Sequence, residues 1–433
     1  MRAMKDSGVE WIGEIPQDWD RTKLLNLLRV PISDGPHETP KLINSGIPFI
    51  SVDSVGNGEN IDLTVCKKFI SEEDYINYSK KTKIESGDIL FTKAATIGKT
   101  AIVRDEIFMV WSPIAIIKTN NEIVHNKYIY YVLSSSEFIK HVSLLGSYNT
   151  QINVGMRELE RAMISLPPKD KQKSIVVYLD SKCSKIDTII EKQQAVIEKL
   201  KEYKLSVITE AVTKGLNPDV EMKDSGVEWI GEIPKHWSIS HIGNLAEIGA
   251  GSTPDRNKME YWDDGTIPWM SSGEINYEYV YGTQEYITEL GLKNSSLKLL
   301  PINTVMLGLI GQGKTKGMSA ILKVETTCNQ NLAYLITNDK WLHYEYLFYS
   351  FKAMYMYIRG LVGESQAGIY QYFLKKQYIP LPCISEQKVI CNRLNVLCKN
   401  IDAVIQSKKK KIKLLGEYKK SLIYEVVTGK KEV

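Results

Sequence analysis

The sequence MKDSGVEWIGEIP occurs twice in this chain of 433 residues, at positions 4–16 and again at 222–234. The two copies are identical, lie 218 positions apart, and are each followed at the same distance by a tryptophan, Trp19 or Trp237. This period is much longer than the 20–50 residues of solenoid and propeller repeats. The chain is therefore expected to consist of two similar halves, each large enough to form a domain.

A second repeated segment closes each half. Residues 166–213 and 381–428 match at an offset of 215, while the residues between the repeated segments have diverged. We expect a variable domain at 1–166, a constant helix at 167–215, a second variable domain at 216–380 and a second constant helix at 381–433. The paired positions that carry the match include Gln172 and Gln387, Ile186-Asp187 and Ile401-Asp402, and Glu202-Tyr203-Lys204 and Glu417-Tyr418-Lys419.

The constant segments have the pattern of long helices. No proline or glycine interrupts residues 171–213, and Gly215 stands where a C-terminal cap belongs. Apolar residues recur in heptads, which is typical of a coiled-coil seam. At 1.5 Å per residue, each helix would be about 60 Å long. The predicted seam of the first helix consists of Leu179, Ile186, Gln193, Leu200 and Val207, with Ile189, Val196 and Tyr203 three residues later in the heptad.

The second constant segment keeps this register, but Lys408 and Lys411 interrupt the seam, and Ile405 and Ile412 offer an adjacent apolar stripe. A long helix with one apolar stripe needs a partner. The repeated copy is the obvious one, and an antiparallel pair is favoured because a whole domain connects the two helices. In the alternative, each helix packs on its own variable domain. The predicted seam residues are Leu394, Leu397, Ile401, Val404, Leu415, Tyr418 and Leu422.

Positive charge is concentrated on the constant segments. Residues 171–214 carry +3 and residues 385–431 carry +8, so the rest of the chain carries −7 of the whole-chain net charge of +4. Such lysines often form only a solvated helix face, and the alternative is contact with a polyanion or an acidic partner.

The variable domains are predicted to be mixed α/β. Short β-rich runs at 47–52, 88–91, 305–310 and 320–324 alternate with turns, and helical patterns cover 127–145 and 341–361. The fold class is therefore α/β, with two mixed domains separated by two long helices that pair as an antiparallel coiled coil.

Cysteine and histidine spacing indicates no metal site. The six cysteines form no C-x-x-C pair, and the six histidines form no H-E-x-x-H or H-x-x-x-H pair. Reduced thiols are expected, and with no signal peptide in view the location is expected to be cytoplasmic. The longest apolar-rich run, 107–117, contains Ser112 and Pro113 and is too short to cross a bilayer, so no membrane contact is expected.

The stretch from Gly308 to Thr315 matches the P-loop pattern G-x-x-x-x-G-K-[ST]. A P-loop must open a helix whose N-terminal amides hold phosphate. Residues 316–322 instead have the pattern of a turn followed by a strand, so we favour a glycine-rich surface loop over a nucleotide site. Micromolar ATP binding that depends on Lys314 would contradict this interpretation.

Neither F-x-G-x-G nor [DNS]-P-P-[FYW] occurs in the sequence, and no nuclease-like carboxylate set stands out. No catalytic, cofactor-binding or metal-binding residue is therefore predicted. The pattern is typical of a recognition protein without an active site, although a coiled-coil scaffold without DNA contact would also fit the long helices.

Together these motifs resemble the specificity subunit of type I restriction–modification enzymes. The resemblance rests on the W-I-G-E-I-P-x-x-W openings at 11–19 and 229–237, and on the loops at 34–40 and 251–254 that lead to I-P-F and I-P-W. It also rests on the elements PPKDKQ and PCISEQ that precede each long helix. The resemblance covers nearly the whole chain, and these motifs occur in the same order twice.

The resemblance implies two target-recognition domains that each read half of a bipartite double-stranded DNA sequence. It also implies that the helices set the spacing and dock two modification (methyltransferase) subunits. Those subunits would bring S-adenosylmethionine, and restriction (motor and nuclease) subunits would bring ATP and Mg. An orphan system that only methylates DNA is the alternative.

Candidate DNA-contacting residues lie in the predicted loops of both variable domains. Lysine and arginine suit phosphate or guanine, and glutamine suits adenine. For any one of them, a solvated loop side chain is an equally good interpretation. The candidates are Ser33, His37, Lys41, Lys93, Thr96 and Lys99 in the first domain, and Thr253, Arg256, Lys258, Gln312, Lys314 and Thr315 in the second.

Overall fold

The computed structural model describes residues 2–56, 58–148, 152–310, 314–361 and 368–433. The chain divides into two compact units, and the division passes through both long helices. Unit 1 comprises residues 1–193 and 409–433, and unit 2 comprises residues 194–408. Each unit therefore contains one variable domain, part of the helix that follows it, and part of the other long helix.

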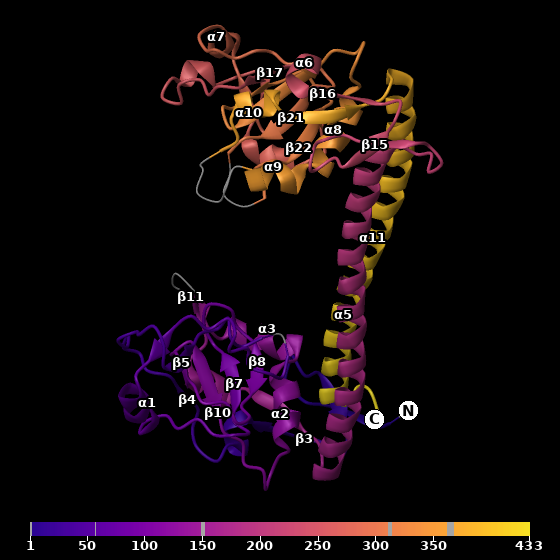
Figure 1. Ribbon diagram of the computed structural model, residues 1–433. Coiled ribbons are helices and arrows are strands. Elements are labelled where there is room, and N and C mark those ends of the chain that lie inside the picture. The colour runs from indigo at the N-terminus through magenta and orange to yellow at the C-terminus, as the bar shows by residue number, and fades with distance from the viewer. Residues whose placement is uncertain (1, 57, 149–151, 311–313, 362–367) are drawn as a thin grey trace. The chain divides into compact units, whose positions relative to one another are not determined.

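Two long helices, α5 (Lys169–Lys214) and α11 (Ile384–Val427), form the frame of both units (Figure 1). The predicted helix at 171–213 is therefore confirmed. The short strands and helices of the two variable domains confirm the mixed α/β fold class. No helix in the described part of the chain combines the length and apolar character needed to cross a membrane. All six cysteines are free thiols, as expected.

Unit 1 opens with a β-hairpin formed by the repeated motif, and its variable domain holds a four-stranded sheet, β4-β10-β7-β8, and a three-stranded sheet, β6-β5-β9. Its short elements are β1 (Met4–Asp6), β2 (Glu14–Pro16), β3 (Asp20–Lys23), η1 (Leu24–Leu27), β4 (Ser33–Asp34), β5 (Ile47–Ile50), β6 (Phe69–Ile70), α1 (Glu72–Ser79), β7 (Ile89–Thr92), β8 (Thr100–Ile102), β9 (Met109–Val110), β10 (Ile114–Ile117), α2 (Asn126–Leu133), α3 (Ser136–Leu144), β11 (Ser147–Tyr148), β12 (Ile152–Asn153), α4 (Met156–Arg161) and β13 (Met163–Leu166).

Unit 2 repeats the hairpin and has a five-stranded sheet, β17-β24-β21-β22-β19, beside a three-stranded one, β20-β18-β23. Its short elements are β14 (Met222–Asp224), β15 (Glu232–Pro234), β16 (Ser238–His241), α6 (Ile242–Leu245), β17 (Ala246–Ala250), η2 (Met259–Tyr261), β18 (Ile267–Met270), η3 (Ser272–Asn276), β19 (Tyr279–Val280), β20 (Glu285–Ile287), α7 (Glu289–Lys293), β21 (Val305–Gly308), β22 (Ser319–Leu322), β23 (Thr327–Cys328), β24 (Leu332–Thr337), α8 (Tyr344–Ala353), α9 (Tyr355–Leu361), α10 (Gln371–Lys375) and β25 (Tyr378–Leu381).

The entry and exit of each variable domain lie side by side. In unit 1, β3 pairs antiparallel with β13, so that Asp20 faces Leu166. In unit 2, β16 pairs antiparallel with β25, so that Ser238 faces Leu381. Each variable domain is therefore inserted into the frame through one pair of neighbouring strands.

Within each unit, the two long helices pack together in opposite directions. In unit 1, Leu179 and Ile186 of α5 share a core with Leu422 and Val426 of α11. In unit 2, Ile208 of α5 and the first turns of α11 share the other main core. The antiparallel pairing predicted from the sequence is confirmed.

The second apolar position of each heptad was predicted to lie three residues after the seam position, and this prediction is wrong. The slot that is buried lies four residues after the seam position. Ile189, Val196 and Tyr203 are 39%, 37% and 54% exposed. The slot four residues later contains Cys183 and Ile197, which are both buried. Both slots are largely apolar in sequence, so the helix pairing and not hydrophobicity selects between them. The same correction applies to Val404 and Tyr418 of α11, which are exposed, whereas the adjacent stripe residue Ile405 is buried.

A lysine lies in the four-residue slot of each helix and forms an ion pair with the opposite helix. In unit 2, Lys204 Nζ lies 2.7 Å from Asp402, and in unit 1, Lys419 Nζ lies 2.7 Å from Asp187. The two pairs are equivalent, because Asp187 corresponds to Asp402 and Lys204 to Lys419 in the repeat. Burial lowers the pKa of Lys204, but hydrogen bonding to Asp402 and the nearby Glu278 carboxylate outweigh it, so the pKa is raised.

We expect the Asp187–Lys419 pair to specify the pairing of the helices. The single change Asp187→Lys should destabilise unit 1 by about 1 kcal/mol, because two lysines then face each other in the seam. The double change Asp187→Lys with Lys419→Asp should recover most of this loss, as urea unfolding would measure. Lys201→Ala, which removes an exposed pair with Glu198 on α5, is the control and should cost less than about 0.5 kcal/mol. Equal stability of the single and double variants would contradict a direct interaction.

Candidate nucleic-acid interface

Two buried glutamines join the constant elements PPKDKQ and PCISEQ to the variable domains. Gln172 accepts a hydrogen bond from the His125 backbone N–H at 2.7 Å and donates one to the Pro167 carbonyl at 2.9 Å. In unit 2, Gln387 accepts from the His343 backbone N–H at 2.8 Å. His125 and His343 immediately precede α2 and α8. Each glutamine therefore links the start of a long helix, through a hydrogen bond, to the start of a helix in the variable domain.

One buried tyrosine in each variable domain binds the end of the long helix that comes from the other half of the chain. In unit 1, the Tyr128 hydroxyl donates to the Val427 carbonyl at the end of α11, at 3.1 Å, and also lies 2.9 Å from the Ser165 carbonyl. In unit 2, the Tyr346 hydroxyl donates to the Val212 carbonyl near the end of α5, at 2.9 Å. Neither tyrosine was among the residues predicted from the sequence, although their spacing of 218 residues matches the repeat.

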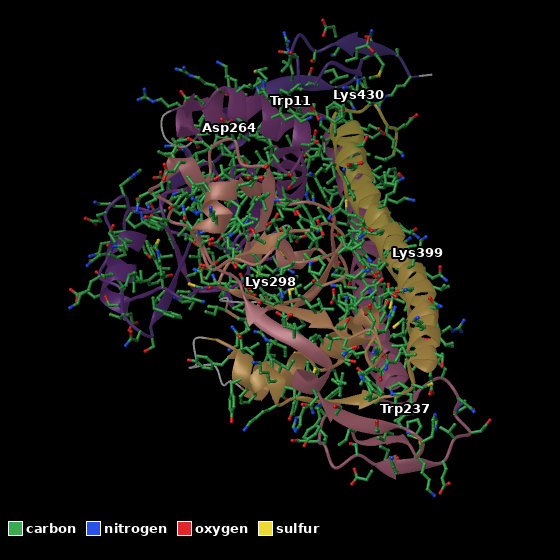
Figure 2. All side chains as sticks on the ribbon, turned by 90° about the horizontal axis from the view of Figure 1, so that it is seen from above. Trp11, Trp237, Asp264, Lys298, Lys399 and Lys430 are labelled. Carbon is green, nitrogen blue, oxygen red and sulfur yellow. The ribbon has the colours of Figure 1, made fainter. Side chains whose placement is uncertain are left out.

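The repeated opening motif packs against the same helix ends. Gly429 and Gly215 follow α11 and α5 with φ of 74° and 77°, the left-handed conformation of a helix C-cap. A Cβ on Gly429 would lie 3.2 Å from the Trp19 ring, and one on Gly215 would lie 3.1 Å from the Trp237 ring. Figure 2 labels Trp237, which follows the β14–β15 hairpin. The constant motifs thus form one frame that is used twice.

Among the candidates of the first domain, Lys93 lies in the loop between β7 and β8, as predicted, but its side chain is buried. Its side chain is 8% exposed and its Nζ lies 3.2 Å from Asp34 Oδ2. His37, which is well exposed, lies 3.3 Å from the same oxygen. Ser33 lies on strand β4, not in a loop. The Lys93 ammonium is paired with the Asp34 carboxylate inside the domain, so a DNA contact by this lysine would first require the ion pair to open.

The other first-domain candidates lie nearer the surface. Lys41 and Thr96 are exposed, whereas Lys99 is half-buried and donates to the Val52 carbonyl at 3.0 Å. The loop between β7 and β8 is held by Thr92, which donates to the Thr96 carbonyl at 2.5 Å. This loop therefore presents the Thr96 side chain from a fixed backbone.

In the second domain, Arg256 is the most strongly positioned candidate. Its guanidinium carbon lies 3.7 Å from the centre of the Trp262 ring and 4.8 Å from that of Trp269, and the side chain forms an ion pair with Glu285. Trp269 is itself held by a hydrogen bond from its indole N–H to the Ser252 carbonyl at 3.0 Å. Arg256 is thus an exposed cation on a fixed aromatic surface, which is how arginine is presented to planar acceptors.

Two neighbours of Arg256 are also held by side-chain contacts. Lys258 donates to the Tyr261 hydroxyl at 3.1 Å, and this hydrogen bond raises the pKa of the lysine. Thr253 donates to the side-chain oxygen of Gln330. Thr253 is half-buried and Lys258 is exposed, so the structure brings Thr253, Arg256 and Lys258 together on one loop.

The P-loop pattern lies between two antiparallel strands. Strand β21 pairs with β22, with Met306 opposite Ala320, so a hairpin replaces the strand-to-helix turn that a P-loop requires. Lys314 is exposed, and its carbonyl accepts a hydrogen bond from the Tyr355 hydroxyl at 2.8 Å. Thr315 is half-buried, and Gln312 lies outside the described residues. The predicted turn and strand are confirmed.

Replacing Gln387 by leucine should destabilise unit 2 by about 2 kcal/mol, because the buried His343 N–H and the Pro382 carbonyl would lose their partner. Urea unfolding of the full chain would measure the change. The matched control is Gln194→Leu on the exposed face of α5, for which we expect a change within about 0.5 kcal/mol. Similar effects of the two substitutions would show that Gln387 does not join the helix to the domain.

Comparison with known proteins agrees with this architecture. The model of the family described as "Type I restriction modification DNA specificity domain" matches residues 17–199 and 234–414. The type I restriction enzyme MjaVIII specificity subunit of Methanocaldococcus jannaschii is 29% identical, over 96% of this chain and 93% of its own length.

Solved structures with low sequence identity share the fold. A chain from a structure titled as the basis of complex assembly and conformational transition of the type I R-M system has a TM-score of 0.71 at 14% identity, covering 95% of this chain and 98% of that one. The HsdS subunit from Thermoanaerobacter tengcongensis has a TM-score of 0.51 at 14% identity, covering 96% and 98%. Since the family model matches most of both halves, this chain belongs to the type I restriction–modification DNA specificity family.

Proposed function

We propose that each variable domain of this specificity subunit reads one half of a bipartite DNA target, and that α5 and α11 set the distance between the half-sites. The observation that carries the proposal is the double use of one frame. The glutamine and tyrosine attachments are the same in both units. A constant frame that carries two different surfaces suits the reading of two different half-sites.

The two surfaces differ in architecture and in chemistry. The larger sheet has four strands in unit 1 and five in unit 2. The first domain has the buried Lys93–Asp34 pair, whereas the second has the exposed Arg256 on its tryptophans. Arginine suits the O6 and N7 acceptors of guanine in the major groove, and exposed lysines suit phosphates. We propose base or phosphate contacts by the exposed candidates of each domain.

The chain is proposed to act without catalysing a reaction itself. Two modification subunits, docked on the helices, would supply S-adenosylmethionine, and restriction subunits would supply ATP and Mg. Neutralisation of phosphates by basic residues provides most non-specific DNA affinity. Because the variable domains carry a net negative charge, the partner subunits are proposed to supply the basic surface. We therefore expect weak DNA binding by the chain alone. An orphan complex that only methylates DNA would use the chain in the same way.

Arg256→Ala should weaken DNA binding by the assembled methyltransferase complex by about 10- to 100-fold, and should relax the preference at one base of a single half-site. Arg256→Lys is the sharper variant, because it keeps the charge but loses the planar fork. It should restore part of the affinity and none of the base preference. Competition binding against targets altered at each position would measure both effects. The control is Lys298→Ala, which removes an exposed lysine paired with Glu247. Lys298 is labelled in Figure 2.

Exchanging residues 20–165 for the equivalent region of a relative should change one half-site only. The exchange is structurally clean, because both ends of the region lie in the β3–β13 pair and the helix ends that close the unit are kept. Methylation mapping in cells that also contain the modification subunit would identify the new target. A change in both half-sites, with the complex assembled, would contradict two independent readers.

Adding one heptad to each long helix should lengthen the spacer between the half-sites. The insertions would follow Gln193 in α5 and Lys408 in α11, which are the sequence boundaries of the two units, and seven residues preserve the seam. Seven residues add about 10 Å of helix, which is close to three base pairs. Methylation mapping should find unchanged half-sites at the larger spacing. An unchanged spacer in an active complex would show that the helices do not set it.

The chain assayed without modification subunits is the control, and should transfer no methyl group.

A further inference from the structure

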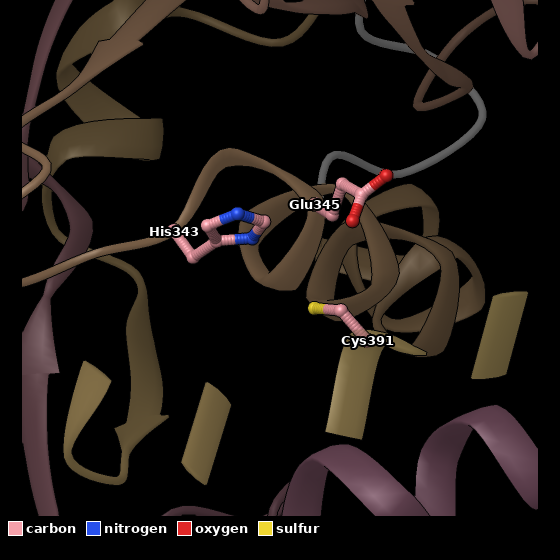
Figure 3. Close-up of side chains that lie close together, drawn as sticks. All are labelled: His343, Glu345 and Cys391. Carbon is pink, nitrogen blue, oxygen red and sulfur yellow. The ribbon is translucent and has the colours of Figure 1, made fainter. Parts of the chain in front are cut away.

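Three side chains that can bind a metal ion meet in unit 2, where α8 contacts the first turns of α11. One ligand atom each from His343, Glu345 and Cys391 lies within 4.8 Å of the other two (Figure 3). His343 occupies the N-cap position of α8 without a side-chain capping bond, Glu345 lies in the first turn of α8, and Cys391 lies on α11. Cys391 is fully buried, and the other two residues are half-buried.

Two of the polar groups in this cluster have few partners among the described residues. Nδ1 of His343 is buried and has no hydrogen-bond partner among the described residues. The Glu345 carboxylate accepts a hydrogen bond from the Asn395 side chain at 3.2 Å, but it forms no ion pair within the described part of the chain. The cluster therefore combines a free imidazole nitrogen with an uncompensated negative charge beside a thiol.

The equivalent place in unit 1 has different side chains at two of the three positions. The repeat puts His125 at the position of His343, Lys127 at that of Glu345 and Val176 at that of Cys391. Lys127 forms ion pairs with Asp180 at 2.9 Å and with Glu59 at 2.6 Å. The His125 ring also has an unpartnered Nδ1, so this nitrogen is common to both units. What distinguishes unit 2 is that a carboxylate and a thiol replace the lysine and the valine.

We propose that His343, Glu345 and Cys391 bind a divalent transition-metal ion of the zinc type. Imidazole nitrogen, thiolate sulfur and carboxylate oxygen are ligands that zinc prefers, and three protein ligands with a water molecule complete a tetrahedral shell. On binding, the Cys391 thiol releases its proton to solvent and becomes the thiolate ligand. No electron transfer is involved.

Such an ion would crosslink the second variable domain to α11. Helix α8 belongs to the variable domain, and α11 is part of the frame, so one ion would bridge the two. Burial raises the pKa of the Cys391 thiol, and the Glu345 carboxylate raises it further. The first unit, with its Lys127 ion pairs, needs no ion at the equivalent joint.

Cobalt titration of the full chain tests the proposal, with Cys383→Ser as the background so that the exposed thiol does not contribute. We expect one Co²⁺ per chain, with a thiolate-to-cobalt charge-transfer band that Zn²⁺ abolishes. Zn²⁺ should also raise the thermal midpoint. Cys391→Val, which installs the residue found in unit 1, should remove the band and the stabilisation. Glu345→Gln keeps the thiol and should weaken binding by at least about tenfold.

The controls are His125→Ala and Cys398→Val, which alter the equivalent histidine of unit 1 and another buried cysteine of α11, and both should bind cobalt as the parent does. Thermal melting of each metal-free variant shows whether it is folded, and Glu345→Gln decides the question if Cys391→Val does not fold. The proposal is overturned if the parent binds no stoichiometric metal, if folded Cys391→Val keeps the charge-transfer band, or if Glu345→Gln binds as tightly as the parent.

Discussion

Neither long helix can bury its apolar stripe alone, and the rest of the structure depends on this constraint. Each helix exceeds forty residues and carries one seam, so it must find a partner along its length. The antiparallel repeat provides that partner within each unit, and the seam lysines are neutralised by aspartates of the opposite helix. Because the two ion pairs are equivalent through the repeat, one set of contacts serves twice.

The same pairing explains how the units are closed. Each variable domain is attached to the beginning of the helix that follows it and to the end of the helix from the other half. The hydroxyls of Tyr128 and Tyr346 bind carbonyls near those distant ends, and Trp19 and Trp237 pack against the glycines that follow them. Neither core is therefore complete until the whole chain has been assembled, since each requires residues from both halves of the sequence.

A fixed frame leaves the variable domains free to change. Their ends meet in one pair of antiparallel strands, so a different domain can be accommodated without altering the frame. The contrast between the buried Lys93 and the exposed Arg256 shows how far the two surfaces have diverged. The contact between domain and helix has diverged as well. It is a lysine ion pair in unit 1 and a cluster of histidine, glutamate and cysteine in unit 2.

The sequence by itself determined the two-fold repeat, the long helices, the mixed α/β domains and the family, because these depend on identity and periodicity, which are local properties of the chain. Only the tertiary structure decided which apolar stripe is buried, since both slots of the heptad are apolar and the partner helix chooses between them. It also decided that Lys93 is buried against Asp34, and that His343 and Cys391 meet although they are far apart in sequence. Such contacts depend on how distant segments pack, and packing is a property of the folded chain as a whole.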